Sequence, residues 1–374
     1  MAVAQESVAG RRWPAWGWAW ALVLAVAAAG VGTALAGTAS PFVVVFWPRG
    51  ALGPAAGWAW HVAASAALGW GAWRWWRRPF LGVASAGLMA FHPLGAELAR
   101  YGVCGWMFAA TLLVAAGWGV AGGAGRVGKA LGAALALVGA AALLWAMASA
   151  LGMVDYYWDE DVAIAKDLGA NPLWAVFGGW TRHLRLALMG WPLCLAPDQA
   201  VAGVKDGRFW MGALWLAVAA WGAWKARKAW PEMCTGLAWM LAGHLATWGL
   251  SCVANVPLAA DAYAYAVLPG AALAVGTLLD RQGKGVARWA GWLCLMAVLA
   301  GLSGVRAYQW KTTGPWGAAA AANPRSLDAL VALSDDAMLR GDDDAAKTFR
   351  KEAVRLGEAA EKAVAERMAA EAAP

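Results

Sequence analysis

Three consecutive acidic residues follow two tyrosines and a tryptophan near the middle of the chain. They are Asp159, Glu160 and Asp161. A carboxylate in such a place can take a proton from an acceptor hydroxyl, as a general base does. A run of acidic residues is also typical of a solvated loop. The sequence therefore offers a candidate catalytic carboxylate and, with it, a purely structural alternative.

Basic residues follow in the amphipathic stretch 174–197. Arg182 and Arg185 flank His183 closely, among Trp and Leu residues. Guanidinium groups suit a phosphate because they donate paired hydrogen bonds, so these three residues could stabilise a phosphate leaving group. On a helix that meets lipid, the same arginines can instead extend toward headgroups.

Four further polar residues stand at the ends of hydrophobic stretches. Arg100 is another candidate phosphate ligand, while His92, Glu97 and Asp261 could supply polar groups on the same side of the molecule. Simpler interpretations exist, because Glu97 and Arg100 have the spacing of an ordinary ion pair on a helix. His92 is similarly suited to hydrogen bonding at a helix end.

Metal and haem sites are disfavoured. The chain has four histidines, and only a pair at matched depth could ligate haem on both faces; none is evident. His244 is expected to be hydrogen-bonded inside a helical bundle. The five cysteines form no CxxC motif and therefore no cysteine metal site, and we assign no metal ligand. A disulfide between Cys194 and Cys252 is an alternative to small buried thiols.

Composition places these residues in a membrane protein. Of 374 residues, 61% are hydrophobic and only 14% are charged, whereas a soluble domain needs roughly a quarter charged. The 29 Trp residues agree, because Trp concentrates at membrane interfaces. The net charge of +7 arises between hydrophobic segments, which indicates topology and not nucleic-acid binding.

About nine spanning helices are predicted, because each needs about twenty apolar residues. The segments are 13–36, 57–76, 79–94, 101–121, 130–152, 209–224, 232–254, 262–279 and 287–305. The fold class is therefore all-α, a polytopic membrane domain over 13–305 after a cytoplasmic N-terminus, residues 1–12.

The placement of basic residues predicts the orientation. Five clusters fall on one side if the nine helices alternate, beginning with Arg11 and Arg12. The positive-inside rule puts that side in the cytoplasm and places a large loop, 153–208, and the tail, 306–374, outside. We expect the inner membrane of a bacterium, in contact with membrane lipids. A cleaved signal peptide ending near residue 36 is the alternative for the first segment.

The tail is different in kind. Ser326 is a plausible N-cap, and Leu327, Leu330, Val331, Met338 and Leu339 form a helical stripe. Gly341 and the following aspartates break the chain before a second helix that runs to about Met368. An αα-hairpin of this size has little stability alone, so we expect it to pack on the membrane domain, a protein partner or a second copy.

Several of these patterns together resemble the membrane proteins that join a GT-C-type glycosyltransferase domain to tetratricopeptide (TPR) repeats, the transmembrane-and-TPR O-mannosyltransferase-like family. Phe91-His92-Pro93-Leu94 with Glu97 resembles that family's Phe-x-x-His-Pro…Glu segment. Trp60-His61 is similar to its His-containing start of the second helix. Asn171-Pro172-Leu173, followed by Arg182-His183-Leu184-Arg185-Leu186, resembles its Asn-Pro-Leu…Arg-Tyr-Leu-Arg-Leu stretch.

Two further segments carry the same resemblance. Asp261-Ala262-Tyr263-Ala264-Tyr265 is similar to the family's Glu-Arg-Tyr-Leu-Tyr. In the tail, five residues match positions of one TPR unit: Leu330, Leu333, Gly341, Ala346 and Ala353. The resemblance covers most of the chain from residue 57.

The resemblance implies transfer of a sugar from a polyprenyl-phosphate carrier to a periplasmic acceptor, with no resident cofactor and an undetermined need for a divalent metal. In that family, acidic residues of the first outer loop act as the base or help to hold a metal. Here the corresponding loop, 37–56, contains no Asp or Glu. The alternative function is therefore a non-catalytic membrane scaffold that recruits partners through its outer loop and TPR-like tail.

Overall fold

A computed structural model of the chain describes eight stretches: residues 54–95, 105–122, 126–138, 172–190, 207–254, 261–282, 285–322 and 327–372. Within these stretches the protein is helical and contains no strand, which confirms the all-α class. The elements are α2 (Pro54–Trp76), α3 (Pro79–Ala90), α5 (Gly105–Ala121), a helix over 126–138, α8 (Pro172–Met189), α9 (Gly207–Ala229), α10 (Pro231–Ala254), the 3-10 helix η2 (Asp261–Ala266), α11 (Leu268–Gln282), α12 (Gly285–Ala322), α13 (Leu327–Leu339) and α14 (Asp343–Ala372).

Where the structure describes them, the predicted apolar segments from 57 onward are helical, but several boundaries differ; the segment 13–36 and residues 139–152 of the fifth segment lie outside the described residues. α3 ends at Ala90, before the predicted 94, because Pro93 disfavours helical backbone in the residue before it. The segment 262–279 divides into η2 and α11, and Pro269 lies in the first turn of α11, where a proline is tolerated. α9 continues to Ala229 through residues that favour helix, and Pro231 begins α10.

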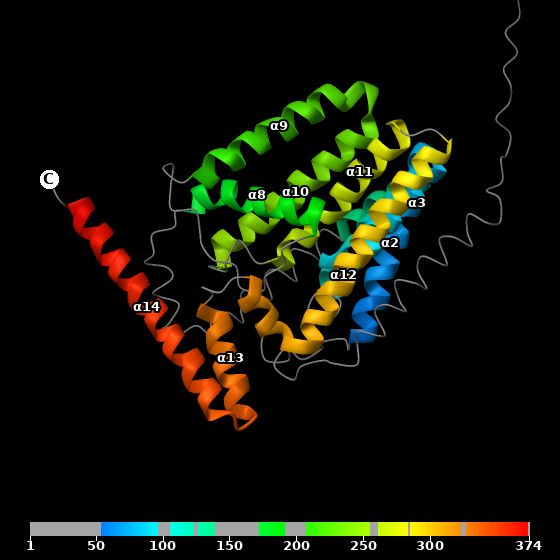
Figure 1. The fold of residues 1–374 in the computed structure, drawn as a ribbon. Helices are drawn as coiled ribbons and strands as arrows, with labels where there is room; N and C mark the ends of the chain where they lie inside the picture. The colour runs from blue at the N-terminus through cyan, green and yellow to red at the C-terminus, as the bar shows by residue number, and fades with distance from the viewer. Residues whose placement is uncertain are drawn as a thin grey trace, which may run out of the picture.

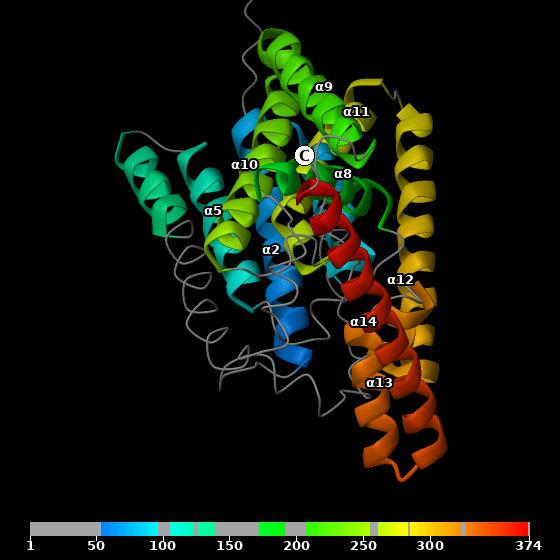
Figure 2. The same ribbon diagram turned by 90° about the vertical axis from the view of Figure 1, so that its left-hand side faces the viewer.

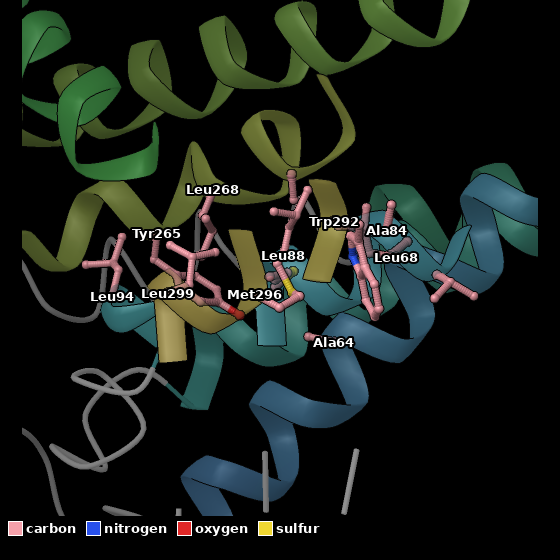
Figure 3. Close-up of a cluster of buried hydrophobic side chains, with 14 of the residues drawn as sticks. Ala64, Leu68, Ala84, Leu88, Leu94, Tyr265, Leu268, Trp292, Met296 and Leu299 are labelled. Carbon is pink, nitrogen blue, oxygen red and sulfur yellow. The ribbon is translucent and has the colours of Figure 1, made fainter. Parts of the chain in front are cut away.

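The helices form one bundle, which Figure 1 shows with α9 along its upper edge and α12 along its right side. α2 packs between α3 and α5, α11 packs against α10 and α3, and α8 packs against α9, α10 and η2. The buried core between these helices includes Leu68, Leu88, Tyr265, Trp292 and Met296 (Figure 3).

Three helix pairs approach closely at reciprocal glycines. A Cβ atom on Gly69 would lie 2.5 Å from the Gly82 carbonyl oxygen, and one on Gly82 would lie 2.6 Å from the Gly69 oxygen. Gly236 and Gly270 join α10 to α11 in the same way, at 2.8 and 2.5 Å. Gly117 and Gly132 do so between α5 and the helix over 126–138. Small residues at helix crossings are a common device of membrane helix packing.

The outer faces of several helices are apolar. On α9, Trp210, Leu214, Trp221 and Trp224 are all exposed. Within the described residues one helical stretch, Gly285–Gln309 of α12, is long and apolar enough to cross a membrane, and shorter apolar helices occur at Pro79–Ala90 and Thr111–Ala121.

Basic clusters gather at one end of the bundle. Arg78 of the α2–α3 connection, Glu232 at the start of α10 and Arg281 at the end of α11 are in direct contact there. Gly122 at the end of α5 lies against Trp75 at the end of α2, which brings the Arg126 cluster to the same end. This end is at the upper right in Figure 1, opposite the C-terminal helices.

The tail forms a helical hairpin of α13 and α14, as predicted (Figure 2). Gly341 has a φ of +75° in the turn, where a residue with a side chain would be strained, and Asp342 accepts a hydrogen bond from the Ala345 amide at 3.1 Å. α12 continues unbroken past residue 305, where the last predicted spanning segment ends, to Ala322, so the first part of the predicted tail belongs to this helix. The proposed N-cap, Ser326, lies outside the described residues.

The predicted apolar stripe of the first tail helix is wrong in part. Leu330 is buried, but Val331, Met338 and Leu339 are exposed. The buried face is made largely of small residues, which lets α13 and α14 approach closely; it includes Ala329, Leu330, Leu333, Ser334 and Ala337 on α13 with Ala346 and Ala353 on α14. Leu330, Leu333, Ala346 and Ala353 are also the residues that match TPR positions.

Candidate functional site

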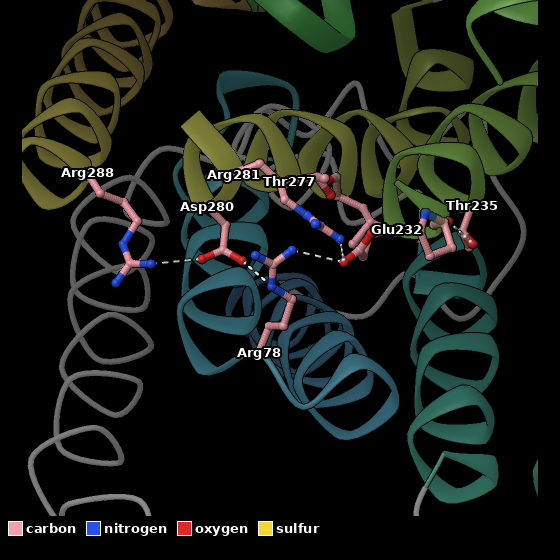
Figure 4. A network of polar contacts seen from close by, with 9 residues as sticks. Arg78, Glu232, Thr235, Thr277, Asp280, Arg281 and Arg288 are labelled. Carbon is pink, nitrogen blue, oxygen red and sulfur yellow. Dashed lines mark hydrogen bonds and ion pairs between the residues drawn. The ribbon is translucent and has the colours of Figure 1, made fainter. Parts of the chain in front are cut away.

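The basic end of the bundle contains an ion-pair network (Figure 4), the arginine–carboxylate cluster of Arg78, Glu232, Asp280, Arg281 and Arg288. Arg78 pairs with Glu232 at 2.9 Å and with Asp280 at 2.7 Å, so it bridges both carboxylates. Arg281 completes the pairing of Glu232 at 2.7 Å, and Arg288 that of Asp280 at 3.0 Å.

The carboxylates of this cluster are buried and the guanidiniums reach the surface. The Glu232 and Asp280 side chains are 3% and 4% exposed, whereas the three arginines are 28–31% exposed. Arg288 also lies over the Phe80 ring, 4.4 Å from its centroid. The cluster therefore ties the starts of α3, α10 and α12 to the end of α11, and each carboxylate is ion-paired to two arginines.

Sequence reasoning missed Glu232 and Asp280. The arginines were interpreted only as signals of membrane orientation. Each carboxylate is a single acidic residue near a helix end, so no sequence pattern linked it to the arginines. One signal was present, since Asp280 and Glu232 are the acidic residues nearest to basic clusters in otherwise apolar segments.

A second polar group is centred on His61, inside the bundle. Its Nδ1 lies 3.0 Å from the Tyr265 hydroxyl of η2, and its Nε2 lies 3.4 Å from the Ala90 carbonyl oxygen. A carbonyl only accepts, so in the neutral ring Nε2 carries the proton and Nδ1 accepts from the tyrosine. A Cβ on Gly95 would overlap the imidazole, so the segment 90–95 wraps closely around His61.

His92 lies in that wrapping segment and is itself buried. Its Nδ1 accepts a hydrogen bond from the Leu94 amide at 3.2 Å, which places the proton of the neutral ring on Nε2. Gly190, just after α8, packs against Pro93 and the His92 ring, and it has a φ of +66°. The segment therefore contacts the C-terminal end of α8.

The middle of α8 carries the third polar group. His183 is fully buried, and its Nδ1 lies 3.1 Å from Nδ1 of His244 on α10. Nε2 of His244 donates to the Val176 carbonyl oxygen at 2.8 Å, so Nδ1 of His244 accepts and Nδ1 of His183 donates. Trp180 packs beside this pair, 5.1 Å from the His244 ring. The sequence predicted a hydrogen-bonded His244 but not its partner.

The three predicted phosphate ligands on α8 differ in how deeply their side chains are buried. Arg182 is partly buried and Arg185 is exposed, and their spacing of three residues puts both on one flank of α8, while His183 is buried. The stretch around them is a helix packed against α9, α10 and η2, and not a helix that lies flat on lipid.

Other predicted site residues fall outside the described structure. Asp159, Glu160 and Asp161 lie there, as do Glu97 and Arg100. Asp261 is the first residue of η2, but its side chain is not described. No group of three or more His, Cys, Asp or Glu side chains that could hold a metal occurs in the described part of the chain.

Comparisons with known proteins returned no match: no family model, curated protein or solved structure is significantly similar to the chain. The resemblance therefore depends on the quoted motifs alone, and the structure adds where they lie. His61, His92 and Tyr265 come from three of those motifs. His61 contacts Tyr265 and the Ala90 carbonyl, two residues before His92, and the His92 ring lies against Gly190 at the end of α8, the helix that carries the fourth motif.

Proposed function

We propose that the chain is a multi-pass protein of a bacterial inner membrane that transfers a sugar from a polyprenyl-phosphate carrier to a periplasmic acceptor. The observation that carries the proposal is the convergence of His61, His92 and Tyr265 beside α8, the helix with Arg182 and Arg185. His61 and Tyr265 are 204 positions apart in the sequence, so their contact indicates that the motifs they come from form one region of the fold.

Three features support a membrane location with about nine spans. The outer faces of α9 and α12 are apolar, the helices cross at glycines, and the basic clusters share one end. In the spanning stretch of α12 only 28% of the residues are buried, whereas the core helix of a soluble protein would be mostly buried. The many Trp residues of α2 and α9 lower the mean hydropathy of these helices, although Trp favours membrane interfaces.

Topology can be tested independently of activity. A periplasm-active reporter fused after the hairpin should be active, and one inserted at 123–125, after α5, should be inactive. The reverse result would place the basic end outside and would contradict the orientation.

The catalytic roles follow from chemistry. Arg182 and Arg185 would bind the phosphate of the donor, because a guanidinium matches phosphate geometry. Asp159, Glu160 or Asp161 would take the acceptor proton. In the described bundle the resolved buried carboxylates are Glu232 and Asp280, both ion-paired at the opposite end, so they are not candidates for that step.

The direct test is sugar transfer by the purified protein from a polyprenyl-phosphate donor. An Arg182→Ala, Arg185→Ala variant should lose transfer. Arg126→Ala, Lys129→Ala is the matched control, because it removes two exposed positive charges at the other end and should retain transfer. Equal loss in both variants would contradict the assignment of the phosphate site to α8.

A non-catalytic scaffold is the second candidate. It is favoured by the acid-free loop 37–56 and by the helical hairpin, a form that suits protein recognition. A well-folded protein that transfers no sugar from any of several polyprenyl donors would favour this function.

A further inference from the structure

The hairpin of α13 and α14 has one outward face that its own packing leaves open. On α13, Val331 and Met338 are 46% and 48% exposed, and on α14 Val354 is 54% exposed. Val331 directly follows the buried Leu330, and Val354 directly follows the buried Ala353. Each exposed residue is therefore turned by the same angle, about 100°, from the buried face of its helix.

The two exposed stripes lie on the same side of the hairpin. α13 and α14 run in opposite directions and face each other, so an equal turn about each axis brings both stripes to one side. The stripe of α13 contains Val331, Asp335 and Met338, which are four and three residues apart. The stripe of α14 contains Lys347, Lys351 and Val354, with the same spacing. We call these six residues the hairpin face.

The two halves of the hairpin face carry opposite charge. α13 has three acidic residues and no basic one. Between 345 and 357, α14 has four basic residues, Lys347, Arg350, Lys351 and Arg355, and one acidic residue, Glu352. Arg355 is already paired with Glu352, and Arg340 with Asp336, each within its own helix or turn. Asp335, Lys347 and Lys351 form no ion pair with the described residues.

We propose that the hairpin face binds the hairpin face of a second copy of this chain. A two-fold axis that lies in the plane of the interface, parallel to the helices, lays α13 of one copy over α14 of the other, and this contact then occurs twice. Each acidic stripe meets a basic stripe, and the apolar residues of both copies are removed from water. The result is a four-helix bundle that joins two membrane domains on the outer side. This proposal does not depend on glycosyltransferase activity.

Charge complementarity favours a second copy of the chain as the partner of the hairpin face. A single helical repeat unit buries only one of its faces, and stacking on a neighbour normally covers the other. A lipid surface would meet the acidic α13 and the basic segment 345–357 of α14 together, which favours neither anionic nor neutral headgroups. A copy of the same face, rotated by the two-fold axis, matches both halves at once.

The test uses charge reversal in the full-length protein, co-expressed with two different affinity tags and solubilised in mild detergent. The wild-type tags should co-purify. Asp335→Lys should reduce recovery of the second tag by about tenfold, because a lysine then meets the basic stripe twice. Lys347→Glu with Lys351→Glu should have the same effect.

Restoration distinguishes the proposed contact from damage to the fold. A chain with Asp335→Lys, co-expressed with a chain carrying Lys347→Glu and Lys351→Glu, should recover co-purification, since opposite charges meet again in the mixed pair. Helical content measured by circular dichroism should be unchanged in every variant. Unaltered co-purification by the single-stripe variants, or no recovery in the mixed pair, would overturn the proposal.

Discussion

At one end of the bundle, three arginines surround two buried carboxylates, whereas around α8 the buried polar contacts are made by histidine, tyrosine and backbone groups. Glu232 and His244 are twelve residues apart on α10, about 18 Å, so the two regions share helices but not side chains. In the first region the charged side chains pair with one another and hold helix ends together. The second keeps its buried groups uncharged and carries its arginines on the flank of α8, where a charged ligand could be met.

The largest expected effect comes from removing the bridging arginine. Arg78→Gln leaves each buried carboxylate with one partner instead of two, and breaking a buried ion-pair network costs about 3 kcal/mol. We expect a lower free energy of unfolding in detergent, measured by denaturant titration. Arg74→Gln removes the same charge one turn earlier, from a side chain that forms no ion pair with the described residues, and should change little. Equal effects would mean that the cluster acts only through its net charge.

Overpacking at the α8 region should be the next largest effect. In Gly95→Ala the new methyl group would overlap the His61 ring, and overpacking typically costs about 1–3 kcal/mol. Gly222→Ala on α9 is the control, because its Cβ would lie 3.8 Å from Leu237, an ordinary contact. A Gly95→Ala protein as stable as Gly222→Ala would show that the segment 90–95 can move away from His61 at no cost.

The comparison also shows what the sequence could reveal. Apolar length and charge periodicity predicted where helices lie and the α13–α14 hairpin, because these depend on local composition. The pairings could not be predicted, since Arg78 and Asp280 are two hundred residues apart and only packing brings them together. The same holds for His183 with His244. The tail stripe was misassigned because the small residues Ala329 and Ala337, and not the larger Met338, fill the close helix contact.

The histidine pair allows a finer measurement of the α8 region. His183→Ala and His244→Ala, made singly and together, form a double-mutant cycle across the 3.1 Å contact. Hydrogen bonds between membrane helices couple by about 0.6 kcal/mol on average, and we expect a favourable coupling of that size. The pair His183 and His61 serves as the control and should be additive. Zero coupling between His183 and His244 would mean that the two rings pack together without exchanging a hydrogen bond.

The smallest effect is expected at a surface pair of the hairpin, which sets the baseline for the arginine–carboxylate cluster. Arg355 donates to Glu352 at 2.8 Å, and this hydrogen bond lowers the pKa of the glutamate. A lowered pKa stabilises the fold above the ordinary glutamate value and loses that contribution as the pH falls through the folded-state pKa. Solvent screens an exposed pair almost completely, so Glu352→Gln should leave the thermal midpoint unchanged at pH 7 and at about pH 4. A midpoint that drops in the variant at pH 7 alone would contradict this expectation and show that the Glu352 carboxylate is shielded from solvent. An unchanged midpoint would instead show that burial of the carboxylate, and not the presence of an ion pair as such, gives Arg78→Gln its expected large effect.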